Sequence, residues 1–204
     1  EILGIAESLC GTNMVSSAEM LTLKHKGHMT EIPWHQDLTG IGPEFRVVTI
    51  GIYLDESNPG GGSVKFLPGT QDKEQDIAAL SATANDNLVE LRIKPGDIVL
   101  HDPQVVHCSD LLTEQQLRRT LYYEFRNMEQ IEAEEDWSEA LVQNRLSLLE
   151  TAMAQFKQQF PDKAQFEWHL DQNEYQAHYE EDIESLYDEP IPAAPANYDK
   201  TLVG

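Results

Sequence analysis

A chain of 204 residues with 40% hydrophobic residues can bury the core of one domain, or of one domain with an appendage. Its formal net charge of −22 argues against a nucleic-acid partner, because phosphate groups are bound through Lys and Arg. No apolar run approaches the roughly 18 residues of a membrane span, and no basic, apolar leader is evident. Two distant cysteines, Cys10 and Cys108, form no disulfide framework, so we expect a cytoplasmic protein.

The charge is concentrated toward the C-terminus. Residues 128–204 hold 18 acidic and 4 basic residues, and they therefore carry 14 of the 22 net negative charges. A block of this kind is typical of a solvated segment. We expect it to be peripheral to the chemistry of the protein.

Short strands are predicted along most of residues 1–127. After a short amphipathic helix at 2–9, strands are predicted at 20–26, 31–37, 46–54, 63–67, 88–93, 98–101, 105–108 and 118–125. Gly- and Pro-rich turns separate them, and the polar residues 71–87 favour a loop with a helical turn. About eight short strands with little helix indicate a mainly β fold of the jelly-roll type.

The pattern changes after Asn127. Apolar residues at steps of three, four and seven between Trp137 and Phe160 predict a long amphipathic helix that ends at Pro161. Residues 162–187 leave a second helix open, and the prolines of 188–204 favour an extended tail. We therefore predict a core at 1–127, an acidic helical extension at 128–187 and a Pro-rich tail at 188–204. The long helix would pack on the core or on a second copy of the chain, as in a homo-oligomer.

The stretch His35-Gln36-Asp37 carries the first candidate site. On an extended segment, residues two apart project to the same side, so the imidazole and the carboxylate would face one space. A second imidazole, His107, lies in another apolar, strand-like run. Two histidines and one carboxylate can form the facial triad that holds non-heme Fe(II) and leaves coordination positions open. Taken alone, His35 and Asp37 would more often be a surface pair; His107 and Arg118 are what favour a metal site.

Several motifs in fixed order resemble the phytanoyl-CoA dioxygenase family over about residues 18–127. They are His35-Gln36-Asp37, Leu54-Asp55-Glu56, the stretch from Gly62 to Thr70, Pro95-Gly96-Asp97, and His107 followed by Arg118. The resemblance implies a double-stranded β-helix, cupin-like in shape, that uses Fe(II), 2-oxoglutarate and O2. It also implies that His35, Asp37 and His107 are the metal ligands and belong, with Arg118, to the catalytic set.

The resemblance assigns the far carboxylate of 2-oxoglutarate to an arginine eleven residues after the second histidine, which is Arg118. A guanidinium can donate two parallel hydrogen bonds to a carboxylate. Strand alternation distinguishes it from its neighbour: Arg118 and Thr120 share a face and match the family's Arg-x-Ser pattern, so Arg119 should point outward. Thr120, and also Thr49 on a neighbouring strand, are further candidates for contact with the co-substrate.

The implied reaction converts 2-oxoglutarate to succinate and CO2 and hydroxylates an unactivated C–H bond of a small or lipid-like molecule. Halogenating relatives carry a small residue in place of the carboxylate, so Asp37 favours hydroxylation. The alternative is a non-catalytic jelly-roll binding protein that keeps a metal pocket. The presence of all three ligands together with Arg118 favours the enzyme.

The sequence departs from the family in three places. Only about seventeen residues precede the first core strand, so we expect the N-terminal helical part to be truncated. Gly51 stands where a bulky aromatic is common, which would widen the pocket or leave room for another side chain. The acidic extension has no counterpart in the family.

Some side chains keep two interpretations. Tyr53 and Tyr122 either face the cavity or pack in the core. His101, which precedes Asp102-Pro103, is expected to be a turn residue near the pocket mouth rather than a ligand.

Overall fold

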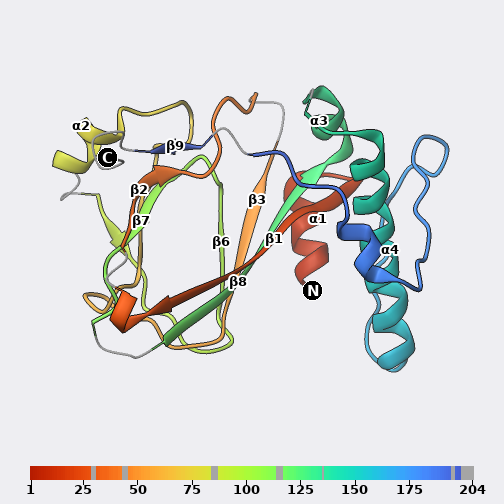
Figure 1. Ribbon diagram of the computed structural model, residues 1–204, viewed down its shortest axis with the longest axis horizontal. Helices are drawn as coiled ribbons and strands as arrows, with labels where there is room; N and C mark the ends of the chain where they lie inside the picture. The colour runs from red at the N-terminus through yellow and green to blue at the C-terminus, as the bar shows by residue number, and fades with distance from the viewer. Residues whose placement is uncertain are drawn as a thin grey trace. The chain divides into compact units, whose positions relative to one another are not determined.

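The computed structural model describes residues 1–28, 31–42, 46–83, 87–113, 117–134, 136–193 and 196–198. The chain forms two compact units (Figure 1). Unit 1 comprises residues 1–18, 44–48 and 124–193, and unit 2 comprises residues 19–43, 49–123 and 194–204. Within the predicted tail, Pro195 lies outside the described residues.

Unit 2 is built from two antiparallel sheets. The four-stranded sheet has the order β1 (Met14–His25), β8 (Leu117–Asn127), β3 (Val48–Tyr53), β6 (Ile98–His101), with β1 and β8 continuing into unit 1. The five-stranded sheet has the order β5 (Val89–Glu90), β4 (Val64–Leu67), β7 (Val106–Ser109), β2 (Ile32–Gln36), β9 (Asn197–Tyr198). The mainly β character predicted for the core is confirmed. Strand β9, in the predicted tail, was not anticipated.

A hydrophobic core joins strands of both sheets within unit 2. Its buried members are Tyr53, Val64, Phe66, Ile93 and Val105. Because side chains alternate along a strand, the inward face of β3 also carries Thr49 and Gly51. The helices of this unit are short, namely η1 (Lys26–His28) and α2 (Ile77–Thr83). The interior therefore receives polar side chains from several strands, and these build the site described below.

Unit 1 is centred on helix α4 (Glu139–Gln159), the long helix predicted to end before Pro161. Ser138 caps it by accepting a hydrogen bond from the amide of Leu141. The unit also contains α1 (Ile2–Cys10), α3 (Met128–Ala133) and η2 (Ile183–Tyr187). Its core cluster consists of Val15, Met128, Ile131, Leu146 and Tyr175. No described helix of the chain is long and apolar enough to cross a membrane.

The second helix left open for residues 162–187 does not form, apart from the short η2. Side chains of α4 bond the backbone of this segment instead. The amide of Gln143 donates to the carbonyl of Gln176, and the hydroxyl of Thr151 accepts from the amide of Glu180. These bonds satisfy peptide groups that a helix would have paired internally.

Candidate metal and co-substrate site

Two histidines on adjacent strands of unit 2 are oriented by the same local device. His35 of β2 lies opposite His107 of β7 in antiparallel register. Each Nδ1 hydrogen-bonds the carbonyl two residues earlier, that of Pro33 at 2.7 Å and that of Val105 at 2.9 Å. A carbonyl only accepts, so each Nδ1 carries a proton, which leaves Nε2 as the ring atom of each histidine that can bind a metal. Both rings are thus prepared to bind a metal through Nε2.

Asp37 completes a cluster of three potential ligands. Its Oδ1 lies 3.0 Å from Nε2 of His35, and its Oδ2 lies 3.5 Å from Nε2 of His107. All three residues offer ligand atoms within 4.8 Å of one another. The two imidazoles are buried, whereas the Asp37 side chain is 37% exposed, so the cluster is open on the carboxylate side. Lone pairs that converge on a carboxylate repel it unless a proton or a cation lies between them. The donor set fits a facial triad.

The electrostatics keep these groups in the form that binds a cation. Burial by itself would raise the pKa of Asp37, but the ring nitrogens of His101 and His35 that face its carboxylate, together with the proximity of His107, outweigh it. The pKa of this carboxyl therefore lies well below its usual range. Burial lowers the pKa of His107 to about 4. Near neutral pH the site thus contains a carboxylate beside a neutral His107.

His101 is a fourth polar group at this cluster. It is the last residue of β6, so the expectation that it belongs to a turn is wrong. Its Nε2 lies 3.7 Å from Oδ2 of Asp37, and its ring centroid is 5.1 Å from that of His107. Within the described part of the chain, neither ring nitrogen of His101 has a hydrogen-bond partner, and the carboxylate of Asp37 is the ion-pair contact of Nε2. Asp102-Pro103 suggested a turn, but alternation from Val99 would have placed His101 on the inward face.

Arg118 is a buried cation that lacks a carboxylate partner. It is 1% exposed, and its Nη1 donates to the carbonyl of Gly62, while its buried Nε has no partner. Among the described residues no carboxylate lies within ion-pair distance of it. A buried charge is costly unless it is paired, so this guanidinium is suited to bind an anionic ligand. Thr120, on the same face of β8, is also buried and its hydroxyl has no described partner.

Arg119 has the opposite orientation, as strand alternation predicted. Its Nε and Nη2 donate to the two carboxylate oxygens of Asp55, both at 2.9 Å, on the outside of the sheet. Its side chain is 45% exposed. Arg119 is therefore already paired and is directed away from the interior.

Lys24 adds a second buried cation near Arg118. Its ammonium group donates to the carbonyl and hydroxyl of Ser109 and to the carbonyl of Asp110. Burial, and then the positive charge of Arg118, lower its pKa to about 8. Two neighbouring cations in the interior fit a dianionic ligand. Thr49, also buried, pairs in register with His101 and so lies toward the metal ligands.

The space left by Gly51 is filled by another side chain. A Cβ at Gly51 would lie 2.8 Å from Cε1 of Tyr122. The Tyr122 ring packs edge-on against Tyr53, with centroids 6.5 Å apart and hydroxyl oxygens 3.4 Å apart. Of the two consequences expected for Gly51, the structure therefore shows room for another side chain. Tyr53 is part of the core, as one of its two interpretations required.

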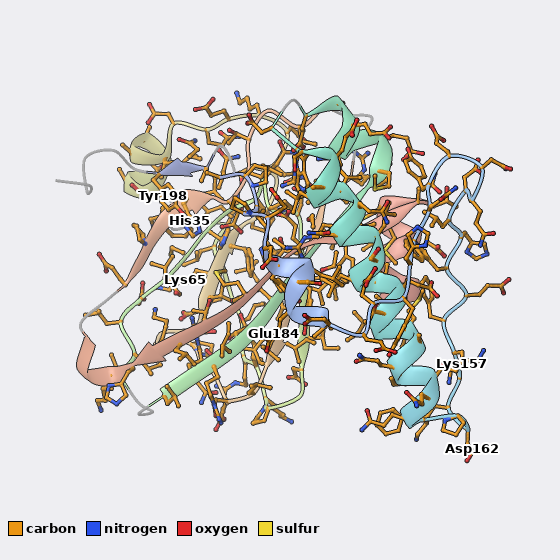
Figure 2. The ribbon with its side chains drawn as sticks, turned by 45° about the vertical axis from the view of Figure 1, so that its right-hand side comes forward. His35, Lys65, Lys157, Asp162, Glu184 and Tyr198 are labelled. Atoms are coloured by element: carbon orange, nitrogen blue, oxygen red, sulfur yellow. The ribbon has the colours of Figure 1, made fainter. Side chains whose placement is uncertain are left out.

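Tyr198 was missed by the sequence-based prediction. Its ring stacks on the ring of His35, and the two residues are labelled side by side in Figure 2. No local pattern could have found this contact, because the two residues are brought together only by the pairing of β9 with β2.

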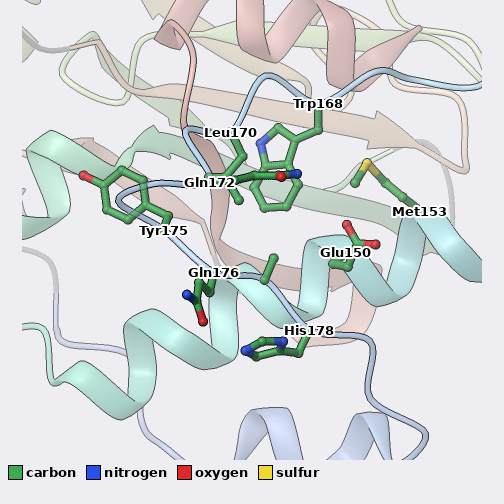
Figure 3. A pocket seen from close by; sticks show the side chains of 9 residues that line it. Glu150, Met153, Trp168, Leu170, Gln172, Tyr175, Gln176 and His178 are labelled. Atoms are coloured by element: carbon green, nitrogen blue, oxygen red, sulfur yellow. The ribbon is translucent and has the colours of Figure 1, made fainter.

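A separate cavity lies within unit 1 (Figure 3). It has a volume of about 450 Å³ and is lined by residues of α4 and of the segment after it, among them Glu150, Met153, Trp168, Tyr175 and His178. None of the site residues predicted from the sequence contributes to its lining. The predicted chemistry therefore belongs to unit 2.

Comparison with known proteins agrees with this geometry. The family model described as phytanoyl-CoA dioxygenase (PhyH) matches residues 1–120. The structure of EvdMO1 is similar with 30% identity and a TM-score of 0.56, covering 63% of this chain and 30% of that chain. AviO1 from Streptomyces viridochromogenes Tue57 follows with 28% identity and a TM-score of 0.55, covering 62% of this chain and 57% of its own.

A more distant structure supports the fold. EctD from S. alaskensis, solved with 2-oxoglutarate and 5-hydroxyectoine, shares 20% identity with a TM-score of 0.53, over 62% of this chain and 49% of that chain. The present chain thus spans less than two thirds of each of these structures. A search of curated proteins found no match.

Proposed function

The chain belongs to the phytanoyl-CoA dioxygenase family, and from that premise we propose that it is an Fe(II)- and 2-oxoglutarate-dependent dioxygenase. The observation that carries the proposal is that unit 2 contains two groups of side chains suited to bind ligands of opposite charge. One is the cluster of His35, Asp37 and His107, which calls for a cation. The other is buried Arg118, which calls for an anion. A metal ion chelated by a dicarboxylate would place the cation at the first group and a carboxylate at the second.

The strand order supports the double-stranded β-helix that the family has. Strands β1, β8, β3 and β6 form one sheet, while β5, β4, β7 and β2 form most of the other. We take this alternation of strands between two sheets as support for a jelly roll. We infer that the metal ligands lie between the two layers of such a fold.

His35, Asp37 and His107 would hold iron by one face and leave the other coordination positions open. When bound, iron and 2-oxoglutarate supply the activation of O2 and the oxidation of an unactivated C–H bond. The hydrogen bonds from Nδ1 to the Pro33 and Val105 carbonyls keep both rings aligned for binding. The partly exposed side of Asp37 leaves an approach for the co-substrates and the substrate.

Arg118 would bind the far carboxylate of 2-oxoglutarate through paired hydrogen bonds. Lys24 would add positive charge beside it, with its three N–H groups already bonded to Ser109 and Asp110. Thr120 would donate its free hydroxyl, and Thr49 would contact the co-substrate nearer the metal. These residues bind and orient the co-substrate, while the iron ligands govern the reacting end.

We also propose that the chain hydroxylates a small-molecule or lipid-like substrate. The support is the family resemblance together with the carboxylate of Asp37.

A cytoplasmic location is proposed because both cysteines are free and buried. Association through α4 stays a prediction: Phe156 and Phe160 remain 43% and 40% exposed at its end, and light scattering would measure the mass in solution.

The alternative is a metal-containing binding protein without catalysis, and a direct assay distinguishes the two. Anaerobic addition of Fe(II) and 2-oxoglutarate should produce a visible metal-to-ligand absorption band. On admission of air, slow formation of succinate is expected even without the substrate. The band without succinate would favour the binding protein. Loss of both would contradict the proposed function.

A further inference from the structure

Strand β9 pairs with β2, which carries His35 and ends at Gln36, directly before Asp37. The two strands lie side by side in Figure 1. In antiparallel register, Tyr198 lies opposite His35, and Asn197 lies opposite Gln36. On its other side, β2 pairs with β7 through an irregular register, with a shift between Ile32 and His35. Such an irregularity disrupts the ladder locally and bends the strand. Strand β9 adds a second hydrogen-bonded neighbour to β2, on the edge opposite β7.

Asn197 closes a buried amide network around Gln36, the residue between His35 and Asp37. Its Nδ2 donates to Oε1 of Gln36 at 3.0 Å and to the carbonyl of Gln75 at 2.8 Å. Oε1 of Gln36 also accepts from the amide of Gln75 at 2.9 Å. Gln36 in turn donates from Nε2 to the carbonyls of Lys73 and Gln104.

Every hydrogen-bonding position of the Gln36 side chain is thus used, and Gln36 is fully buried. A satisfied buried network is rigid, because any displacement leaves polar groups unpaired in a low-dielectric interior. Rigidity of this kind defines the backbone on either side of Gln36. It therefore helps to define the positions of His35 and Asp37.

Tyr198 restrains the imidazole of His35 directly. The two rings are parallel to within 3°, with centroids 5.0 Å apart. The Nδ1 hydrogen bond to Pro33 fixes one edge of the imidazole, and the tyrosine ring covers one of its faces. Together they oppose rotation of the ring that would turn Nε2 away from the cluster. Tyr198 is 41% exposed, so the core does not depend on it.

We propose that Asn197 and Tyr198 are positioning residues of the metal centre, through which the C-terminal strand holds His35 and its strand in the geometry that binds the ion. The inference rests on the metal site of the proposed function and extends it to a segment about 160 residues beyond the ligand. Neither residue touches the metal ion. Removing either should loosen the site rather than abolish it.

The test uses the whole chain and Co(II) alone as the probe, so that no turnover is required. Two variants disrupt the arrangement: Tyr198→Thr removes the ring but keeps a residue suited to strands, and Asn197→Ala removes the amide. Two controls preserve it: Tyr198→Phe keeps the stacked ring, and Tyr179→Ala removes a tyrosine that is 50% exposed in unit 1. The measurements are the Co(II) affinity, the visible spectrum at saturation and the rate of Co(II) release to a chelator.

Loss of groups that support a metal ligand typically weakens metal binding by about 10- to 100-fold. We expect Tyr198→Thr and Asn197→Ala to lie near the lower end of that range, with faster release and an altered spectrum. Tyr198→Phe and Tyr179→Ala should match the unmodified chain. Circular dichroism checks that each variant is folded. If Asn197→Ala is unfolded, the comparison of Tyr198→Thr with Tyr198→Phe tests the positioning role by itself.

The outcomes distinguish failure of the positioning role from failure of the metal site. If the unmodified chain binds Co(II) and Tyr198→Thr binds and releases it identically, the positioning role is wrong and the metal site stands. If the unmodified chain binds no Co(II), the metal site itself is contradicted and the positioning role is overturned with it.

Discussion

His101 directs its Nε2 toward Oδ2 of Asp37 at 3.7 Å, the same carboxylate oxygen that faces His107. A neutral imidazole with its proton on Nε2 can donate to this oxygen once the contact tightens. Such a bond would leave Oδ1 as the free ligand atom of Asp37. Partners of this kind orient ligating carboxylates and tune metal affinity.

Replacing His101 with Phe should therefore weaken metal binding without unfolding the chain, because the ring already packs beside Phe66. We expect about a tenfold loss of Co(II) affinity. Titration followed by visible absorption measures it, with His178→Phe as a control, since His178 lines the cavity of unit 1. Unchanged Co(II) affinity in His101→Phe would show that His101 does not orient the carboxylate of Asp37 for metal binding.

Arg118 and Arg119 should differ strongly in their effect on the co-substrate. Arg118→Ala removes the buried partner of a carboxylate and should raise the dissociation constant for 2-oxoglutarate at least about tenfold, the factor for some 1.4 kcal/mol. Arg119→Ala removes only an exposed pair with Asp55 and should change it less than about twofold.

Isothermal titration with the metal-loaded protein measures both constants. Arg118→Lys is an informative third variant, because an ammonium group cannot reproduce the two parallel hydrogen bonds of a guanidinium. Equal effects of Arg118→Ala and Arg119→Ala would mean that the co-substrate binds on another face of β8.

Lys24 should make 2-oxoglutarate binding depend on pH. Its pKa is about 8, so the ammonium form predominates below that value and attracts the dianion. As pH rises through 8 the charge is lost and the affinity should fall. The fall reaches up to about tenfold if the bound dianion raises the pKa of the lysine by one unit.

The other groups that act on Lys24 are Arg118, Asp110, Cys108 and Glu31. Burial raises the pKa of Cys108 to about 12, so its thiol stays neutral in this window. Affinities measured between pH 7 and 9 should thus show the decline, and Lys24→Met should give weaker binding with a flat profile. A decline that persists in Lys24→Met would assign the titration to another group.

Substitutions at Gly51 and Tyr122 should have non-additive effects on the free energy of unfolding. In Gly51→Ala the new methyl group would collide with the Tyr122 ring, and overpacking of this kind costs about 1–3 kcal/mol. In a Tyr122→Leu background the cost should largely disappear, because the ring edge is gone. Denaturant unfolding of the four proteins of this cycle measures the coupling.

Gly4→Ala is the control for that cycle, since open space surrounds a Cβ at this helical position. There alanine should stabilise α1 by up to about 1 kcal/mol. Additive effects of the changes at 51 and 122 would show that the two positions do not share the space.

Local periodicity was sufficient for much of this site. Side chains two residues apart on a strand must share a face, which placed His35 with Asp37 and separated Arg118 from Arg119. The same alternation, read with the turn signals, predicted the strands that carry these residues. Such inferences succeed because they depend only on the geometry of one extended segment.

Contacts between segments required the tertiary structure. Tyr122 fills the space at Gly51, His101 faces Asp37, and Tyr198 stacks on His35 only because strands pair in particular registers. Register is set by hydrogen bonds and packing between residues far apart in the chain, and it leaves no periodic trace in either segment. The residue types of the metal site could thus be predicted from the sequence, whereas the side chains that support them were decided by the pairing of the strands.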